Sequence, residues 1–183
     1  MTEPIILYSK ECFTLIKNDK NKYSLSFYIE NNNILLSKIL DFNLIKLIYE
    51  LNPDIYEKVN IQILNENEAI VNLLMKHLFE DLGLPQRFSY LNIKKTNNND
   101  TILFTTESIK DERPPDMPED AELMNINNSS IKCNVITPHK INFECNFIFE
   151  KTMIIPEVLE KLIGLILYKV FNRIKQFIEN VKL

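Results

Sequence analysis

The residues most able to do chemistry lie in the string Thr137-Pro138-His139-Lys140. A histidine beside a lysine could contact an anion, and an imidazole can act as a general acid or base near neutral pH. The same string is ordinary turn chemistry, in which proline fixes the backbone and polar side chains are solvated. The sequence places no nucleophile or carboxylate beside it. We therefore expect a turn, keep His139 and Lys140 as candidate anion contacts, and assign no catalytic residue.

The cysteines and histidines are too few for an evident metal centre. The chain has 3 cysteines and 2 histidines, without a CxxC pair. An odd number of unpaired cysteines indicates reduced, intracellular thiols. A cysteine–histidine enzyme would need Cys133 or Cys145 beside His139 in space. We expect Cys12, Cys133 and Cys145 to be small core or edge side chains instead, and we predict no metal site.

A proline-rich acidic loop is expected at residues 110–120. Its carboxylates could bind a cation, but their spacing is not that of an EF-hand, and a solvated loop is the simpler interpretation. The acidic residues around it are Asp111, Glu112, Asp116, Glu119 and Asp120. Prolines at positions 114, 115 and 118 exclude a central strand or a helix interior here.

Composition excludes several classes of function. With 2 glycines the chain cannot form a GxGxxG or P-loop phosphate site, and we predict no cofactor. The net charge of −4 argues against general nucleic-acid binding, which needs a basic face. The longest apolar run, residues 162–168, is too short to span a bilayer. Because Glu3 stands where a secretory signal would be basic, we expect a cytoplasmic protein.

The first half of the chain predicts a hairpin and a helix. Period-two alternation of apolar residues over 11–17 and 22–30 is typical of two half-buried strands. Residues 34–57 then carry apolar side chains at spacings of three and four, which predicts a helix. Asn52-Pro53 is expected to end it, because proline disfavours helical backbone in the preceding residue.

A short strand and a second helix are predicted next. The strand covers residues 58–64. Asn65 or Asn67 then provides an N-cap for a helix over residues 68–82, and Gly83 stands where a C-terminal glycine cap belongs. These two earlier helices are expected to pack beside the C-terminal one.

The second half of the chain predicts five more strands. Their positions are residues 88–95, 101–107, 121–126, 130–136 and 141–149. In the last of these strands, apolar side chains alternate with polar ones from Ile141 onward. One face is therefore expected to meet the core while the other meets solvent, as an antiparallel sheet allows.

The C-terminal helix is the longest predicted element, residues 153–183. Pro156 suits its first turn, where a missing N–H does no harm. Its apolar stripe is wider than a one-sided surface helix requires, so a ligand, another chain or other elements must cover its flanks. We expect a groove between the last strand and this helix. Its candidate ligand- or partner-binding residues are Phe143, Phe147, Leu162, Ile166, Val170 and Ile174.

The C-terminal part resembles helix-grip domains of the START or SRPBCC type. The resemblance is carried by residues 139–179, "HKINFECNFIFEKTMIIPEVLEKLIGLILYKVFNRIKQFIE". It implies a long terminal helix lying across a curved antiparallel sheet, with an apolar cavity between them. The stretch 34–82 departs from this pattern, because it predicts more helix than such domains usually carry.

Residues 65–78, "NENEAIVNLLMKHL", are also similar to the first helix of the α-like dimerisation domain of RNA polymerase assembly subunits. The resemblance implies a transcription-machinery subunit that dimerises through helices. Glu68 and Val71 stand where that family has its usual histidine and glycine, and the family's His-Pro turn is reversed as Pro138-His139.

A third resemblance is to conserved, uncharacterised proteins of large nucleocytoplasmic DNA viruses. It is carried by "TPHKINF" together with the C-terminal helix, and by an amino-acid composition rich in Ile, Asn and Lys. A gene with A/T-rich codons would have the same amino-acid composition without any viral relationship. The resemblance implies the host cytoplasm or the virion as the setting.

Taken together, the sequence predicts a single α+β domain over residues 1–183. A mostly antiparallel sheet of about five to seven strands would be packed by the C-terminal helix and two earlier helices, as in a helix-grip fold. The leading hypothesis is a non-enzymatic binding or assembly protein whose groove takes an apolar small molecule or a protein partner, with homo- or hetero-oligomers open. The alternatives are the polymerase α-like subunit and an enzyme using His139.

Overall fold

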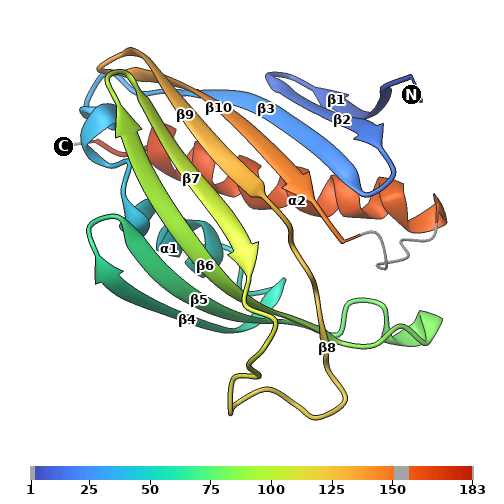
Figure 1. The fold of residues 1–183 in the computed structure, drawn as a ribbon. Helices are drawn as coiled ribbons and strands as arrows, with labels where there is room; N and C mark the ends of the chain where they lie inside the picture. The colour runs from blue at the N-terminus through green and yellow to red at the C-terminus, as the bar shows by residue number, and fades with distance from the viewer. Residues whose placement is uncertain (1–2, 151–156, 183) are drawn as a thin grey trace.

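A single curved antiparallel sheet dominates the structure, a computed structural model that describes residues 3–150 and 157–182 (Figure 1). Its strand order is β1-β2-β3-β10-β9-β7-β6-β5-β4, and a short parallel strand, β8, pairs with β6. The strands are β1 (Ile5–Lys10), β2 (Phe13–Asp19), β3 (Lys22–Glu30), β4 (Tyr56–Asn65), β5 (Glu68–Met75), β6 (Arg87–Asn98), β7 (Thr101–Ser108), β8 (Glu122–Leu123), β9 (Ser129–Thr137) and β10 (Lys140–Ile148). The helical elements are η1 (Leu36–Lys38), α1 (Phe42–Glu50), η2 (Glu80–Leu82) and α2 (Glu157–Glu179), of which η1 and η2 are 3₁₀ turns.

The N-terminal hairpin and the last strand meet in the middle of the sheet. β3 pairs with β10 along its whole length, from Lys22↔Ile148 to Glu30↔Lys140. Asn21 supplies the left-handed backbone of the β2–β3 turn at φ 60°. The predicted hairpin and the predicted final strand are confirmed. So is the fold class, an antiparallel sheet with a C-terminal helix and an earlier helix.

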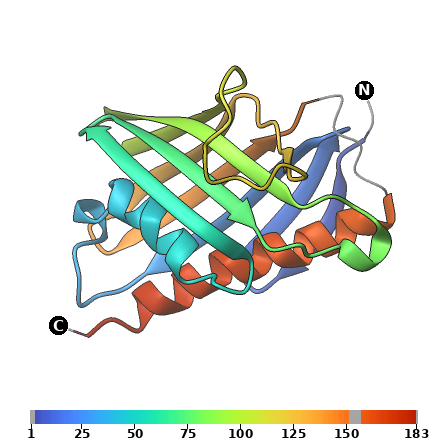
Figure 2. The same ribbon diagram turned by 90° about the horizontal axis from the view of Figure 1, so that it is seen from below.

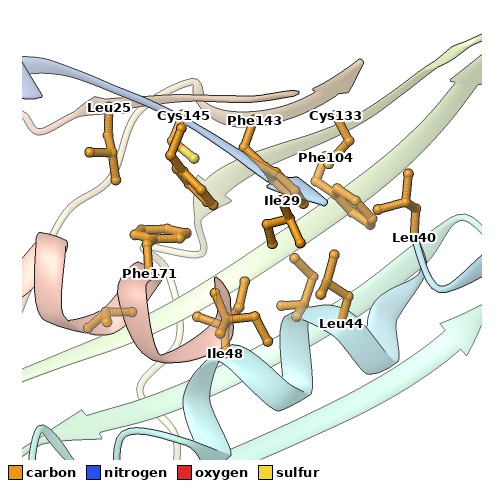
Figure 3. Packing of buried hydrophobic residues seen from close by; sticks show 14 of the residues in the cluster. Leu25, Ile29, Leu40, Leu44, Ile48, Phe104, Cys133, Phe143, Cys145 and Phe171 are labelled. Carbon is orange, nitrogen blue, oxygen red and sulfur yellow. The ribbon is translucent and has the colours of Figure 1, made fainter. Parts of the chain in front are cut away.

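Both helices cover the same face of the sheet (Figures 1 and 2). The core between the layers is aromatic. Phe27 stacks on Phe143 with ring centroids 4.9 Å apart, and Phe171 of α2 lies 5.5 Å from Phe27. Figure 3 shows Phe171 and the α1 residues Leu44 and Ile48 pointing toward the sheet side chains. Burial of such rings stabilises the packing of α2 against this part of the sheet.

The prediction of a helix at residues 68–82 is wrong, because this segment forms strand β5 and the short turn η2. Asn65 does not cap a helix. Its side chain accepts a hydrogen bond from Asn67 N at 2.9 Å and shapes a hairpin turn between β4 and β5. The resemblance of residues 65–78 to a polymerase assembly helix therefore has no helix to support it.

Helix-like spacing arose in β5 because both faces of this strand are covered. Val71 and Leu73 face the main core, while Leu74 packs on the other face with Phe88 and Met117. A strand buried on both sides has a nearly continuous apolar run, which period-based interpretation confuses with a helix.

The predicted helix over residues 34–57 is much shorter in the structure, where α1 spans Phe42–Glu50. Asp41 caps its start, since its carboxylate accepts from Asn43 N at 2.8 Å. Asn52 is buried at its end and donates to Ile48 O at 2.7 Å. The predicted end at Asn52-Pro53 is confirmed, but η1 and a loop replace the first turns.

Several element boundaries also differ from prediction. The sheet is larger than expected because β1 was missed, residues 68–75 form a strand, and β4 extends beyond residues 58–64. The strand expected at 121–126 is only the two residues of β8. α2 ends at Glu179, and the predicted start at Pro156 lies outside the described residues.

The proline-rich loop, residues 110–120, folds onto the outer face of the sheet. Met117 packs in a small cluster with Leu74 and Phe88. The guanidinium of Arg113 lies 4.8 Å from the centre of the Phe88 ring and donates to Ala121 O at 3.0 Å. The loop therefore protects this face of β5 and β6 and is not simply solvated.

Candidate functional site

A cavity of about 240 Å³ lies between α2 and the β4–β6 part of the sheet. The wall formed by α2 is entirely apolar and consists of Leu159, Ile163, Ile166, Leu167 and Val170. Their spacing of three, four or one residue places them on one face of the helix. The wide apolar stripe of the terminal helix is therefore explained in part by this cavity.

The sheet wall is made of inward-facing residues on three neighbouring strands. Cross-strand pairing sets them in rows, with Tyr56 opposite Met75 and Leu73 opposite Ser89. Because side chains alternate along a strand, Ser89 shares its face of β6 with Arg87 and Leu91. The register of β4, β5 and β6 thus positions every group on this wall.

The remaining boundary comes from loops and from β10. Phe147 and Phe149 close one side, and Phe79, Leu84 and Pro85 close another. The 79–85 segment turns at Gly83, whose φ of +68° suits glycine. A ring nitrogen of His77 lies 2.5 Å from Leu84 O and fastens the segment.

Four lining residues carry polar groups, namely Tyr49, Tyr56, Arg87 and Ser89. The Arg87 guanidinium is paired with the Glu122 carboxylate at 2.6 Å. Ser89 is fully buried, and its hydroxyl has no hydrogen-bond partner among the described residues. The other lining side chains are hydrocarbon or thioether.

The two tyrosines form a perpendicular pair with ring centroids 5.1 Å apart. Burial raises the pKa of Tyr49 to about 12, and burial together with the neighbouring Tyr49 raises the pKa of Tyr56. Both phenols therefore stay neutral at physiological pH and keep their donor hydrogens. Their hydroxyls make no hydrogen bond within residues 3–150 and 157–182.

An apolar cavity lies between α2 and a curved antiparallel sheet in this protein, and the same arrangement of helix and sheet is also found in solved structures. The fold is that of StAR-related lipid-transfer domains. The human StarD13 (DLC2) lipid transfer and protein localization domain superposes with a TM-score of 0.72 at 11% identity, covering 99% of this chain and 91% of that domain. A STAR-related lipid transfer protein fragment from Xanthomonas axonopodis gives 0.71 at 8% identity, covering 96% and 98%. Human StAR-related lipid transfer protein 5 gives 0.68 at 11% identity, covering 94% and 85%.

At these identities the likeness to StAR-related domains establishes the fold alone. No family model matches the sequence. No curated protein matches it either. The helix-grip architecture inferred from residues 139–179 is confirmed, and its function must be argued from the residues of the cavity.

The six groove residues expected from the sequence lie in different places on the StAR-related fold. Phe147, Ile166 and Val170 line the cavity. Phe143 and Ile174 are buried in the packed core, where Phe143 stacks on Phe27. Leu162 is 42% exposed on the other side of α2.

The polar lining residues were missed by the sequence interpretation. A signal existed for Ser89, which shares a strand face with Leu91 and Ile93 in the predicted strand 88–95. A serine on an apolar face marks either a close contact or a binding group. Tyr49, Tyr56 and Arg87 carried no comparable signal, since their positions depend on how distant elements pack.

His139 and Lys140 are engaged in contacts within the chain. His139 Nδ1 lies 2.8 Å from Ile34 O and 3.3 Å from Asn31 O. Lys140 pairs with Glu30 at 2.9 Å and lies over the Tyr28 ring, and the Glu30 carboxylate raises the lysine pKa. Neither residue lines the cavity, and both fasten the β9–β10 turn to its surroundings.

The thiols are not placed for chemistry. Cys133 and Cys145 are buried, and burial raises the pKa of Cys133 to about 12 and that of Cys145 well above its ordinary value. A neutral buried thiol is a poor nucleophile. In the part of the chain that the structure describes, no group of three His, Cys, Asp or Glu residues could hold a metal ion. No described helix is long and apolar enough to cross a membrane.

Proposed function

We propose that the protein binds an apolar small molecule in the cavity between α2 and strands β4–β6, without transforming it chemically. The observation that carries the proposal is the cavity itself, whose lining is hydrocarbon except at Tyr49, Tyr56, Arg87 and Ser89. A concave, mostly apolar site with a few polar groups is the usual form of a small-molecule binding site.

The cavity size supports a small ligand or one chain of a larger one. An apolar cavity of roughly 150 Å³ is enough to bind benzene. At about 240 Å³ this cavity has room for a hydrocarbon chain of roughly eight to ten carbons by the same measure. The StAR-related neighbours are described as lipid-transfer domains, which supports a ligand of this chemical class.

A non-catalytic role is supported by the chemistry of the lining. None of its described residues offers a carboxylate, an imidazole or a thiol. Such groups supply most general acids, bases and nucleophiles in enzymes. The comparisons support neither a viral nor a transcriptional role, and neither belongs to the proposal.

Filling the cavity tests the proposal. Ile166→Phe adds volume on the cavity side of α2, whereas Leu165→Phe adds the same ring at a position that is 48% exposed. Binding of the neutral dye N-phenylnaphthylamine is followed by its fluorescence. We expect Ile166→Phe to weaken dye binding roughly tenfold or more, because the space that the dye needs is lost, and Leu165→Phe to leave it unchanged.

Equal dye affinity in the two variants would contradict the proposal. Unfolding curves recorded on both variants separate a filled cavity from a damaged fold. Overpacking costs about 1–3 kcal/mol, so a folded Ile166→Phe variant that has lost dye binding is the informative result.

A protein partner is the second candidate, favoured by one surface. Leu162, Leu165 and Phe177 are exposed on α2 by between 42% and 48%. Exposed apolar side chains on one helix can mark an interface. Light scattering on the wild type and on a Leu162→Ser/Leu165→Ser variant would show an oligomer that the substitutions dissociate, and a monomer in both would exclude self-association through this surface.

A further inference from the structure

Polar groups are distributed unevenly around the cavity. The α2 wall and the β10 side offer only aliphatic and aromatic carbon. The opposite side holds Tyr56 on β4 and Arg87 and Ser89 on β6, with Tyr49 from the end of α1 beside Tyr56. Arg87 and Ser89 are two residues apart on one face of β6, about 7 Å along the strand. The cavity therefore has an apolar side and a polar side.

The hydroxyl groups on the polar side lack partners in the protein. Ser89 is fully buried with an unpaired hydroxyl, and the hydroxyls of Tyr49 and Tyr56 make no hydrogen bond to any described residue. Buried polar groups are almost always hydrogen-bonded, because an unpaired one costs free energy. Ser89 is such a buried, unpaired hydroxyl, and the hydroxyls of the partly buried Tyr49 and Tyr56 belong to the same cavity lining, which indicates that the missing partner is a bound molecule.

The charge on the polar side is already balanced. Arg87 is the charged lining residue among those described, and its guanidinium lies 2.6 Å from the Glu122 carboxylate. A buried carboxylate or phosphate on a ligand would find no uncompensated cation there, and burying an unpaired anion is costly. Neutral hydroxyls, by contrast, can donate to a carbonyl and can donate to or accept from an alcohol.

We propose that the ligand is an uncharged hydrocarbon carrying a hydroxyl or carbonyl group. Its polar group is hydrogen-bonded by one or more of the hydroxyls of Ser89, Tyr49 and Tyr56, and its hydrocarbon lies against Ile166 and Val170 of α2. This inference rests on the proposed function, which it extends by naming the chemistry and the orientation of the ligand.

Three probes with the same hydrocarbon chain test this inference. Octane, octanol and octanoate are compared by displacement of N-phenylnaphthylamine at mildly alkaline pH, in the wild type and in Ser89→Ala and Tyr56→Phe. Each substitution removes one hydroxyl and little else. Ser9→Ala on β1 and Tyr90→Phe on the opposite face of β6 are the controls, because both residues lie outside the cavity.

We expect Ser89→Ala and Tyr56→Phe each to weaken octanol binding roughly threefold to tenfold, as the loss of one hydrogen bond predicts. Octane binding should change less than about twofold, since octane makes no hydrogen bond. Octanoate should bind the wild type more weakly than octanol. The two control variants should bind all three probes as the wild type does.

The outcomes separate the two proposals. If octane and octanol both displace the dye but the substitutions affect them equally, the inference about the polar group is overturned and the proposed function stands. Tighter binding of octanoate than of octanol would also overturn the inference. If the wild type binds neither the dye nor octanol, the proposed function itself fails.

Discussion

Two buried serines have opposite surroundings at the residue scale. Ser129 accepts a hydrogen bond from Ile148 N at 2.8 Å through its hydroxyl. Ser89 lines the cavity with an unpaired hydroxyl. A buried hydroxyl without a partner destabilises the folded state, whereas a bonded one contributes to its stability. Ser89 therefore has the energetic character of a binding residue, retained at the expense of stability.

The pair of serines gives a stability prediction. Ser89→Ala should stabilise the ligand-free protein by about 1 kcal/mol, because it removes an unpaired polar group. Ser129→Ala should destabilise it by about 1–3 kcal/mol, because Ile148 N then loses its partner. Urea unfolding of the two variants measures both values. Destabilisation by Ser89→Ala would mean that its hydroxyl is already satisfied in the free protein.

At the scale of elements, α2 is fixed to the end of α1 by a small ionic cluster. Arg173 donates to Asn52 Oδ1 at 3.0 Å and pairs with Asp54, which also pairs with Lys169. Hydrogen bonds from Arg173 and Lys169 hold the pKa of Asp54 well below its usual range. The cluster fixes how α2 lies against α1. The cavity-lining residues of α2 begin ten residues before Lys169, at Leu159, and end beside it, at Val170.

The cluster predicts a pH dependence. A carboxyl whose pKa is lowered on folding stabilises the protein above its unfolded pKa of about 3.9, and this contribution is lost as pH falls through the folded value. Asp54→Asn should therefore cost about 0.5–1 kcal/mol at neutral pH, a modest value because the pair is partly exposed to solvent. Urea unfolding from neutral pH down to below about pH 4 should show the difference from wild type shrinking.

A matched control for Asp54 is available on α1. Glu50→Gln breaks only the exposed pair of Glu50 with Lys46, at 3.5 Å, and should cost less. An Asp54→Asn defect that is the same size at neutral and at acid pH would show that the carboxylate charge does not act through this cluster.

Strands with one solvent-exposed face were predictable from the sequence, whereas a strand covered on both faces was not. Alternation predicted β3 and β10 because Tyr23 to Ile29 and Ile141 to Cys145 each present a single apolar face. β5 was mistaken for a helix because the proline-rich loop covers its outer side, where Met117 packs on Leu74 from 43 residues further along the chain. No local pattern reveals that distant cover.

At the scale of the whole molecule, the sheet curves around α2 and covers its two ends differently. Phe171, Ile174 and Ile178 pack tightly in the aromatic core. One face of the preceding part of α2 lines the cavity instead, through Leu159, Ile163, Ile166, Leu167 and Val170. The sequence indicated that the apolar surface of this helix is wider than one sheet face can cover. In the structure α2 contacts β1–β3 and α1, and the rest of its apolar surface borders the cavity. Which apolar residues of α2 border the cavity depends on where the packing is incomplete, and the sequence does not show this. The sequence therefore predicted both Ile166 and Ile174 as lining residues, but only Ile166 lines the cavity.

The most direct test is a crystal structure of the protein with octanol brominated at the end of its chain. We predict an anomalous peak from bromine beside Ile166 and Val170, with the hydroxyl within hydrogen-bond distance of Ser89, Tyr49 or Tyr56. A cavity closed by its own side chains, or a bromine peak only outside the cavity, would contradict the claim that this space is a ligand site.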